Sequence, residues 1–152
     1  MCSFAGPQAT STWGFKIGKN FFIAWIVGFI VWMGGDFAVH GAWLAGQYAA
    51  LESLYRPIAE QTQYLPWMMG AHVIMAGAVA WIYARGQTAA PWMGQGARFG
   101  VAAGMLTSAP YLTYYSVQPL PMSLVMNQFA GNLAVMVLVG MSTAFVYRNA
   151  KS

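Results

Sequence analysis

The stretch FFIAWIVGFIVWMGGDFAVHGAWLAG, residues 21–46, contains one acid and no lysine or arginine. A helix needs roughly 20 apolar residues to cross the hydrocarbon core of a bilayer, and this run of about 26 residues exceeds that length. No small-x-small cleavage motif follows the run, which argues against a signal peptide. The stretch therefore predicts a transmembrane helix over residues 20–45.

Three further apolar runs complete the predicted set of spans. Pro66 suits the first turn of a helix over residues 66–85, because a proline there costs no backbone hydrogen bond. The remaining runs predict helices over residues 98–115 and 122–147. The segment 48–65 holds both glutamates and is expected to form the external loop, its first part a helix lying in the membrane interface.

Composition separates this chain from soluble domains. Of its 152 residues, 59% are hydrophobic and 7% are charged, whereas about a quarter of the residues in a soluble domain are charged. Lipid must therefore replace water around much of the surface. The length allows one membrane domain, residues 1–152, and the single cysteine, Cys2, cannot form an internal disulfide. We expect an all-α integral membrane protein, an antiparallel bundle of four transmembrane helices.

The basic residues predict the orientation of this bundle. They are scattered singly at the ends of apolar runs, a pattern that does not favour nucleic-acid binding. Lysine and arginine near span ends are retained in the cytoplasm, and with four spans six of the seven fall on one side. Both termini are thus expected to be cytoplasmic. The six residues are Lys16, Lys19, Arg85, Arg98, Arg148 and Lys151.

Ionisable residues inside the predicted spans mark a candidate site. Asp36 and His40 are four residues apart, hence on one face of an α-helix, and His72 is expected at a similar depth on the second span. Three amide side chains enter the fourth span from the same side and extend this polar layer. They are Asn127, Gln128 and Asn132.

Four interpretations of this layer remain open. Asp36 could pair with His40 or His72, with the amides joining the helices as structural hydrogen bonds. Asp36, His40 and His72 could bind a divalent metal ion. His40 and His72 could be the axial ligands of a haem b. Asp36 could be the proton or cation site of a transporter, although the inner halves of the spans look apolar.

Small residues in the third span predict a packing face. Gly96, Gly100 and Gly104 follow each other at four-residue steps, which leaves a flat groove where another helix can approach closely. The groove can serve packing within this chain, or it can bind a second protein or a second copy of the chain.

Three segments carry a resemblance to known families. They are DFAVHG at 36–41, ESLYRP at 52–57 and ARFGVAAGMLTSAPYLTYYSVQPLPMSL at 97–124. Together they resemble small four-span bacterial inner-membrane families of unknown function, over most of residues 20–148. The resemblance implies the four-helix fold and the bacterial cytoplasmic membrane, and it implies no activity.

These observations lead to a functional expectation. No catalytic motif is present, so we expect a non-enzymatic membrane protein that contacts lipid and packs as an accessory or assembly subunit on other membrane subunits, or on a second copy of itself. The first alternative is a haem-, metal- or quinone-binding protein that uses Asp36, His40 and His72. The second alternative is a small-solute or proton-coupled transporter.

Overall fold

The computed structural model describes residues 18–149, and within that range it contains helices and no strand. The predicted all-α class is confirmed. Four transmembrane helices were predicted, whereas the described residues form five α-helices, of which three are long and apolar enough to cross a membrane. Cys2, Lys16 and Lys151 lie outside the described residues. The elements are α1 (Lys19–Asp36), the π-helix η1 (Phe37–Trp43), α2 (Ala45–Ala49), α3 (Ile58–Gly86), α4 (Trp92–Val117) and α5 (Met122–Tyr147).

Three of the described helices are long and apolar enough to cross a membrane: Lys19–Trp43, Ala59–Gly86 and Met122–Tyr147. The helix α4 has 26 residues, as many as α5, yet it is not among the three. Its sequence includes an arginine, a glutamine and several hydroxyl side chains, which lower its average hydropathy. The predicted span at 98–115 therefore lies in a helix of sufficient length but of less apolar composition.

Prolines set where the later helices begin. Pro57, Pro91 and Pro121 directly precede α3, α4 and α5, each in an extended conformation. Proline suits this position because its nitrogen has no hydrogen to leave unpaired and its φ angle is already close to the helical value. The helices extend beyond the predicted spans: α3 begins eight residues before residue 66, and α4 begins six residues before residue 98. Pro66 lies inside α3 instead of opening it.

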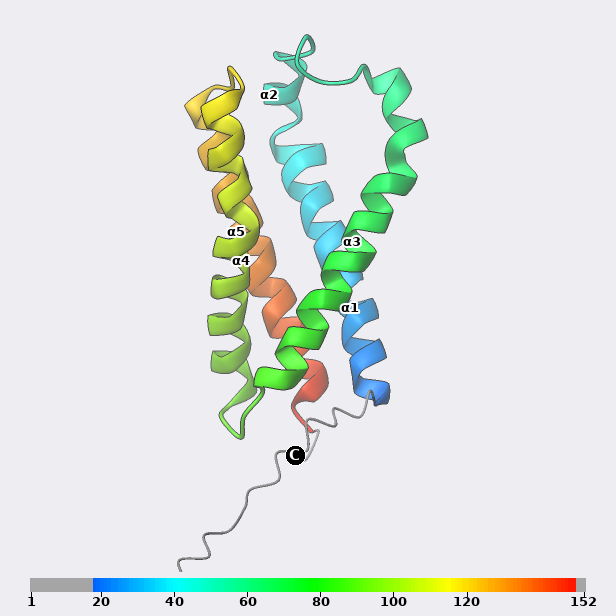
Figure 1. Cartoon of the computed structure of the whole chain (residues 1–152), viewed down its shortest axis with the longest axis vertical. Helices are drawn as coiled ribbons and strands as arrows, with labels where there is room; N and C mark the ends of the chain where they lie inside the picture. Colours follow the sequence, from blue (N-terminus) through cyan, green and yellow to red (C-terminus); the bar gives the residue numbers. More distant parts are fainter. Residues whose placement is uncertain (1–17, 150–152) are drawn as a thin grey trace, which may run out of the picture.

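The four long helices run alternately up and down between two ends (Figure 1). At one end, called the loop end here, lie α2 and the connections that precede α3 and α5. At the other, called the terminal end, α1 begins and α5 finishes. Near the terminal end the rings of Tyr83 on α3 and Phe99 on α4 lie 5.1 Å apart. Toward the loop end α3 leans away from α4 (Figure 1), so these two helices diverge.

The closest helix contact joins α4 to α5. A Cβ atom added at Gly100 would lie 2.6 Å from the backbone oxygen of Met136, and one added at Gly140 would lie 2.5 Å from the oxygen of Gly96. Real Cβ atoms do not approach this closely, so the two backbones meet where side chains are absent. Gly96, Gly100 and Gly104 are all buried at this contact. The predicted packing face is thus occupied by the chain's own α5.

The π-helix changes the geometry around His40. The backbone N–H of Leu44 donates to the oxygen of Val39 at 2.9 Å, a bond that spans five residues instead of four. Each turn of such a helix is wider, and single π turns recur at functional sites. The helix α1 ends at Asp36 and η1 begins directly after it, so His40 lies on a turn that is wider than an α turn.

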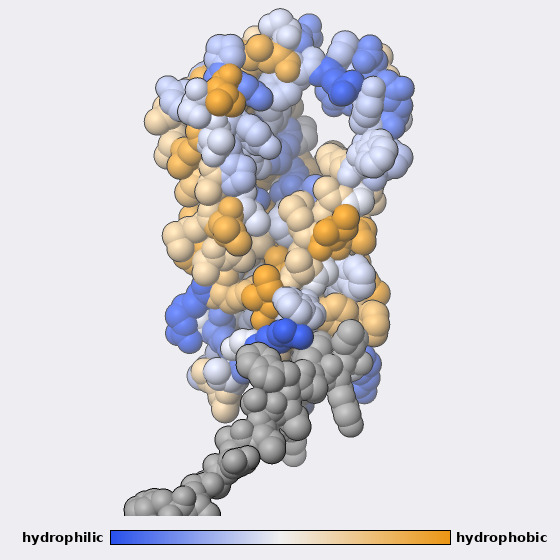
Figure 2. All heavy atoms as spheres, viewed as in Figure 1, coloured by the Kyte–Doolittle hydropathy of each residue, from blue (hydrophilic) through white to orange (hydrophobic). Residues whose placement is uncertain are grey.

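The surface and the interior have the polarity expected of a protein in lipid. Large apolar side chains such as Ile30, Ile74 and Leu106 are more than half exposed. By contrast, His72, Gln128 and several hydroxyl side chains are buried. Hydrophobic residues cover much of the middle of the visible face, and hydrophilic residues gather toward its two ends (Figure 2).

Candidate functional site

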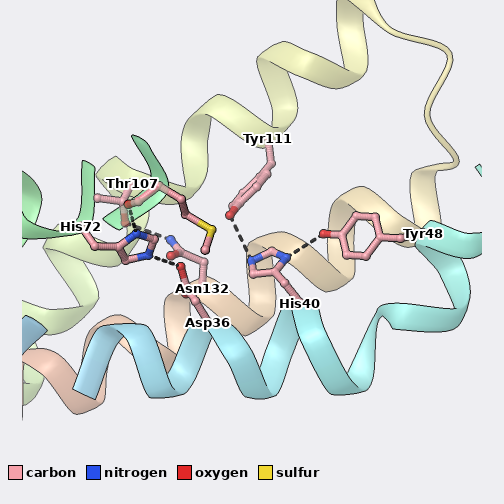
Figure 3. A network of polar contacts seen from close by, with 8 residues as sticks. Asp36, His40, Tyr48, His72, Thr107, Tyr111 and Asn132 are labelled. Carbon is pink, nitrogen blue, oxygen red and sulfur yellow. Dashed lines mark hydrogen bonds and ion pairs between the residues drawn. The ribbon is translucent and has the colours of Figure 1, made fainter. Parts of the chain in front are cut away.

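The centre of the site is a direct contact between Asp36 and His72. Asp36 is the last residue of α1, and His72 lies on α3, which packs against α1. The Nε2 atom of His72 is 2.8 Å from Oδ2 of Asp36, and its Nδ1 atom is 2.8 Å from the backbone oxygen of Met68. The ring of Trp32 meets the imidazole edge-on, with 5.9 Å between centroids. His72 is therefore fixed on three sides, and Figure 3 shows its contact with Asp36.

The partners of His72 determine where its protons lie. The oxygen of Met68 can only accept, so Nδ1 of His72 must carry a hydrogen and donate it. The short contact between Nε2 and Asp36 then holds one further proton, either on the imidazole or on the carboxyl group. In both cases the pair as a whole is neutral. Asp36 and His72 thus form a proton-holding unit that a low-dielectric interior tolerates better than a lone charge.

The second oxygen of Asp36 faces an unusual environment. Its Oδ1 atom is buried and has no hydrogen-bond partner among the residues that the structure describes. The carboxyl group lines a cleft of about 200 Å³, to which Thr107 and Tyr111 of α4 and Asn132 of α5 also contribute. Buried polar atoms almost always have partners, so a carboxyl group with one unpartnered oxygen, on a residue that lines a cleft, is a candidate ligand contact.

Apolar and aromatic side chains form the rest of the cleft wall. Trp32 of α1 and Met75 of α3 lie on one side, and Pro110 and Tyr114 of α4 lie on the other. The cleft therefore lies between the diverging parts of α3 and α4. In the space-filling view, a hollow with hydrophilic atoms at its base separates these two arms of the molecule (Figure 2).

His40 belongs to a second group, on the other side of Asp36 (Figure 3). Its Nδ1 atom is 2.6 Å from the hydroxyl of Tyr48 on α2, and its Nε2 atom is 3.5 Å from the hydroxyl of Tyr111. Gln128 of α5 donates to Tyr48 at 2.9 Å. Burial raises the pKa of Tyr48 above its ordinary value, because the phenolate loses its hydration. Tyr48 therefore stays a phenol that can donate to His40.

Asn132 joins α4 to α5 beside the cleft. Its Nδ2 atom donates to Thr107 at 2.9 Å and to Ser108 at 2.8 Å, and it is buried. The predicted polar layer thus has three parts: Asn132 with α4, Gln128 with Tyr48, and the Asp36 pair. Asn127, by comparison, is half-buried and takes no part in these bonds.

The structure brings together only two of the three residues proposed as metal ligands. Asp36 contacts His72 directly, whereas His40 contacts the two tyrosines. Among the described residues, no group of three or more His, Cys, Asp or Glu side chains is placed to hold a metal ion. Both ring nitrogens of each histidine already face protein partners, so haem ligation would require breaking one of these contacts. Neither interpretation gains support from the geometry.

Sequence reasoning did not single out Tyr48, Thr107 and Ser108 as partners in the layer. Thr107 and Ser108 lie three and four residues beyond Gly104, on the face that meets α5. That spacing, together with the amides of the fourth span, is the signal that could have located them.

A scan against protein-family models, a search of curated proteins and a search of solved structures each found no match to this chain. The resemblance to small four-span bacterial families therefore stays a prediction. What the chain does must be argued from the geometry of the site.

Proposed function

We propose that this chain is an integral membrane protein that binds a small lipid-soluble quinol, a ring bearing hydroxyl groups, in the cleft between α3 and α4. The buried, unpartnered Oδ1 atom of Asp36 carries this proposal. From the sequence, the first alternative was a haem-, metal- or quinone-binding protein. The present proposal keeps the quinone and specifies its reduced form, which bears hydroxyl groups.

The hydrogen-bonding groups of the cleft select for a hydroxyl. Asp36 Oδ1 can accept a hydrogen bond, while its other oxygen is occupied by His72. Tyr111 lines the same cleft, and its hydroxyl hydrogen is available to donate when His40 donates to its oxygen. A phenolic hydroxyl can donate to Asp36 and accept from Tyr111 at once. A ligand without a donor would leave Asp36 Oδ1 unsatisfied, which is costly in a buried site.

The size and the walls of the cleft favour one aromatic ring. At about 200 Å³ it is smaller than pockets for drug-sized ligands, which begin at roughly 300 Å³. Trp32 and Tyr114 provide ring faces and edges, and Met75 provides a polarizable side chain that packs well on aromatic rings. A tail attached to the ring would leave between α3 and α4 into the lipid.

Binding of a short-chain benzoquinol to the full chain in nanodiscs, followed by the fluorescence of Trp32, tests the proposal. Asp36→Leu is expected to weaken binding by about tenfold or more, since a hydrogen bond to a charged group contributes roughly 1.5–3 kcal/mol. The dimethyl ether of the same quinol has the same ring but no donor, so it is expected to bind wild type as weakly as the quinol binds Asp36→Leu.

Trp32→Phe identifies the signal that comes from the cleft, because the chain has seven tryptophans. Equal affinity of wild type for the quinol and its ether would show that Asp36 does not form a hydrogen bond with the hydroxyl of the ligand. An unchanged affinity in Asp36→Leu would also overturn the proposal.

The accessory-subunit hypothesis and the transport hypothesis stay predictions. The glycine face that favoured an external partner packs against α5, so it is not available to another protein. Mass spectrometry of proteins that copurify in stoichiometric amounts tests the first hypothesis, and solute uptake into proteoliposomes tests the second. Cytoplasmic termini in a bacterial inner membrane remain our proposal for the orientation, supported by the lysine and arginine pattern.

A further inference from the structure

A chain of hydrogen-bonding side chains leads from the loop end to the cleft. Gln128 Nε2 lies 2.9 Å from the hydroxyl of Tyr48, which lies 2.6 Å from Nδ1 of His40. Nε2 of His40 lies 3.5 Å from the hydroxyl of Tyr111, which lines the cleft beside Asp36. These four side chains come from α5, α2, η1 and α4, and Figure 3 shows His40 between its two tyrosines.

The donors along this chain point in one direction. The amide nitrogen of Gln128 can only donate, so the Tyr48 oxygen accepts there and its own hydrogen is free to point at His40 Nδ1. His40 then carries its hydrogen on Nε2, directed at Tyr111. The hydrogen of Tyr111 is left to point into the cleft. Each group accepts on one side and donates on the other, which is the arrangement that passes protons.

We infer that the Asp36–His72 pair exchanges protons with the water at the loop end through His40. In each passage Tyr48 takes a proton from water and gives one to Nδ1 of His40. Nε2 gives its proton to Tyr111, and Tyr111 gives one to a hydroxyl in the cleft, of water or of a quinol, which passes one to Asp36. Tyr48, His40, Tyr111 and the cleft hydroxyl each gain one proton and lose one. The reverse passage returns a proton from the Asp36–His72 pair to the water and restores the hydrogen to Nε2 of His40, so the exchange needs no oxidant or reductant.

The surroundings of His40 are consistent with such a relay. Burial raises the pKa values of Tyr48 and Tyr55, so both remain phenols that hold transferable protons. The ring of Tyr55 meets that of Tyr48 edge-on, with 5.2 Å between centroids, on the side toward the connection to α3. The packed helix α5 contributes uncharged amides. The titratable groups around His40 are Asp36, His72, Tyr48, Tyr55, Tyr111 and Tyr114.

No comparable chain leads from the terminal end within the described residues. A cluster of Trp32, Ala76, Val79, Val135, Met136 and Val139 lies between the Asp36 pair and that end. Beyond it, the hydroxyls of Thr143 and Tyr147 are buried and have no hydrogen-bond partner among the described residues. A route from the terminal end would have to run through these two hydroxyls. The geometry therefore makes access one-sided.

Hydrogen exchange at His72 tests this inference. The role of the relay rests on the proposed function, but the measurement needs no ligand. The chain has two histidines, so ¹⁵N-histidine labelling of the full chain in bilayers gives few signals to assign. After transfer to D₂O, His40→Phe is expected to slow exchange of the His72 ring protons about 100-fold, the low end of what a positioned proton-transfer group contributes. Tyr147→Phe is the matched control and should leave the rate unchanged.

Tyr111→Phe provides a second test, since it keeps the ring and removes only the hydroxyl. The ¹⁵N shifts of His72 report whether its bond to Asp36 is intact in each variant. Unchanged exchange in Tyr111→Phe, or slowed exchange in Tyr147→Phe, would overturn the inference. Slowed exchange in His40→Phe and Tyr111→Phe without any quinol binding would support the relay and reject the proposed function. Quinol binding together with unchanged exchange in His40→Phe and Tyr111→Phe would support the proposed function and reject the relay.

Discussion

His72→Leu is expected to lower the free energy of unfolding by about 3 kcal/mol or more, because it leaves one partner of a buried charged pair alone. The loss arises at Asp36, whose Oδ2 contact at 2.8 Å disappears while its Oδ1 already has no partner in the described structure. Titration of the full chain from a mild detergent into a denaturing detergent, followed by helix content, measures the effect.

The double variant Asp36→Leu with His72→Leu is the control for this result. It removes both polar groups, and replacing a buried pair by apolar residues is often neutral or stabilising. Its stability should therefore lie closer to wild type than that of His72→Leu. A double variant that is less stable than the single one would show that the pair itself stabilises the fold, against our interpretation of it as a site that is kept for its chemistry.

Gly100→Ala is expected to destabilise the contact between α4 and α5 by about 1–3 kcal/mol, the usual cost of overfilling a packed interior. The new Cβ atom would lie 2.6 Å from both the oxygen of Met136 and Cα of Val137, and these backbone atoms cannot rotate away as a side chain would. The helices must therefore move apart. The same detergent titration, applied to the intact chain, measures the change.

Gly34→Ala is the matched control, because an added Cβ at that position of α1 meets nothing within 4 Å. It should be neutral or stabilising by up to about 1 kcal/mol, since alanine favours helix more than glycine does. If both variants have the same stability, close approach of the two backbones is not what holds α4 to α5.

The helical class could be predicted from sequence because length and apolarity are properties of single segments. The span at 122–147 coincides with α5 for this reason. The helices α3 and α4 begin before the predicted spans, because the prediction opened one span at Pro66 and the other at the start of an apolar run, and it gave no weight to Pro57 and Pro91. Helices extend past the apolar part of a segment wherever the backbone can continue, and a preceding proline marks that limit better than hydropathy does.

The site was predictable in its residues but not in its pairing. The depth of Asp36 and His72 in their helices placed them at one level, and they do meet. His40, predicted in the same group, instead has its two ring nitrogens against the hydroxyls of Tyr48 and Tyr111. Which polar residue pairs with which depends on the rotation of each helix about its axis, and composition does not report that rotation.

The seven residues of η1 lie between Asp36 and the helix α2 that carries Tyr48, so a deletion within η1 would affect these two residues differently. A π turn holds one residue more than the α turn it replaces, so deletion of a single residue between 41 and 43 would allow a regular α-helix to form. Asp36 lies before the deletion and would keep its contact with His72. Residues after it would turn about the helix axis, and His40 would lose its alignment with Tyr48. Loss of one codon would therefore leave the Asp36–His72 pair in place but remove its connection to the loop end.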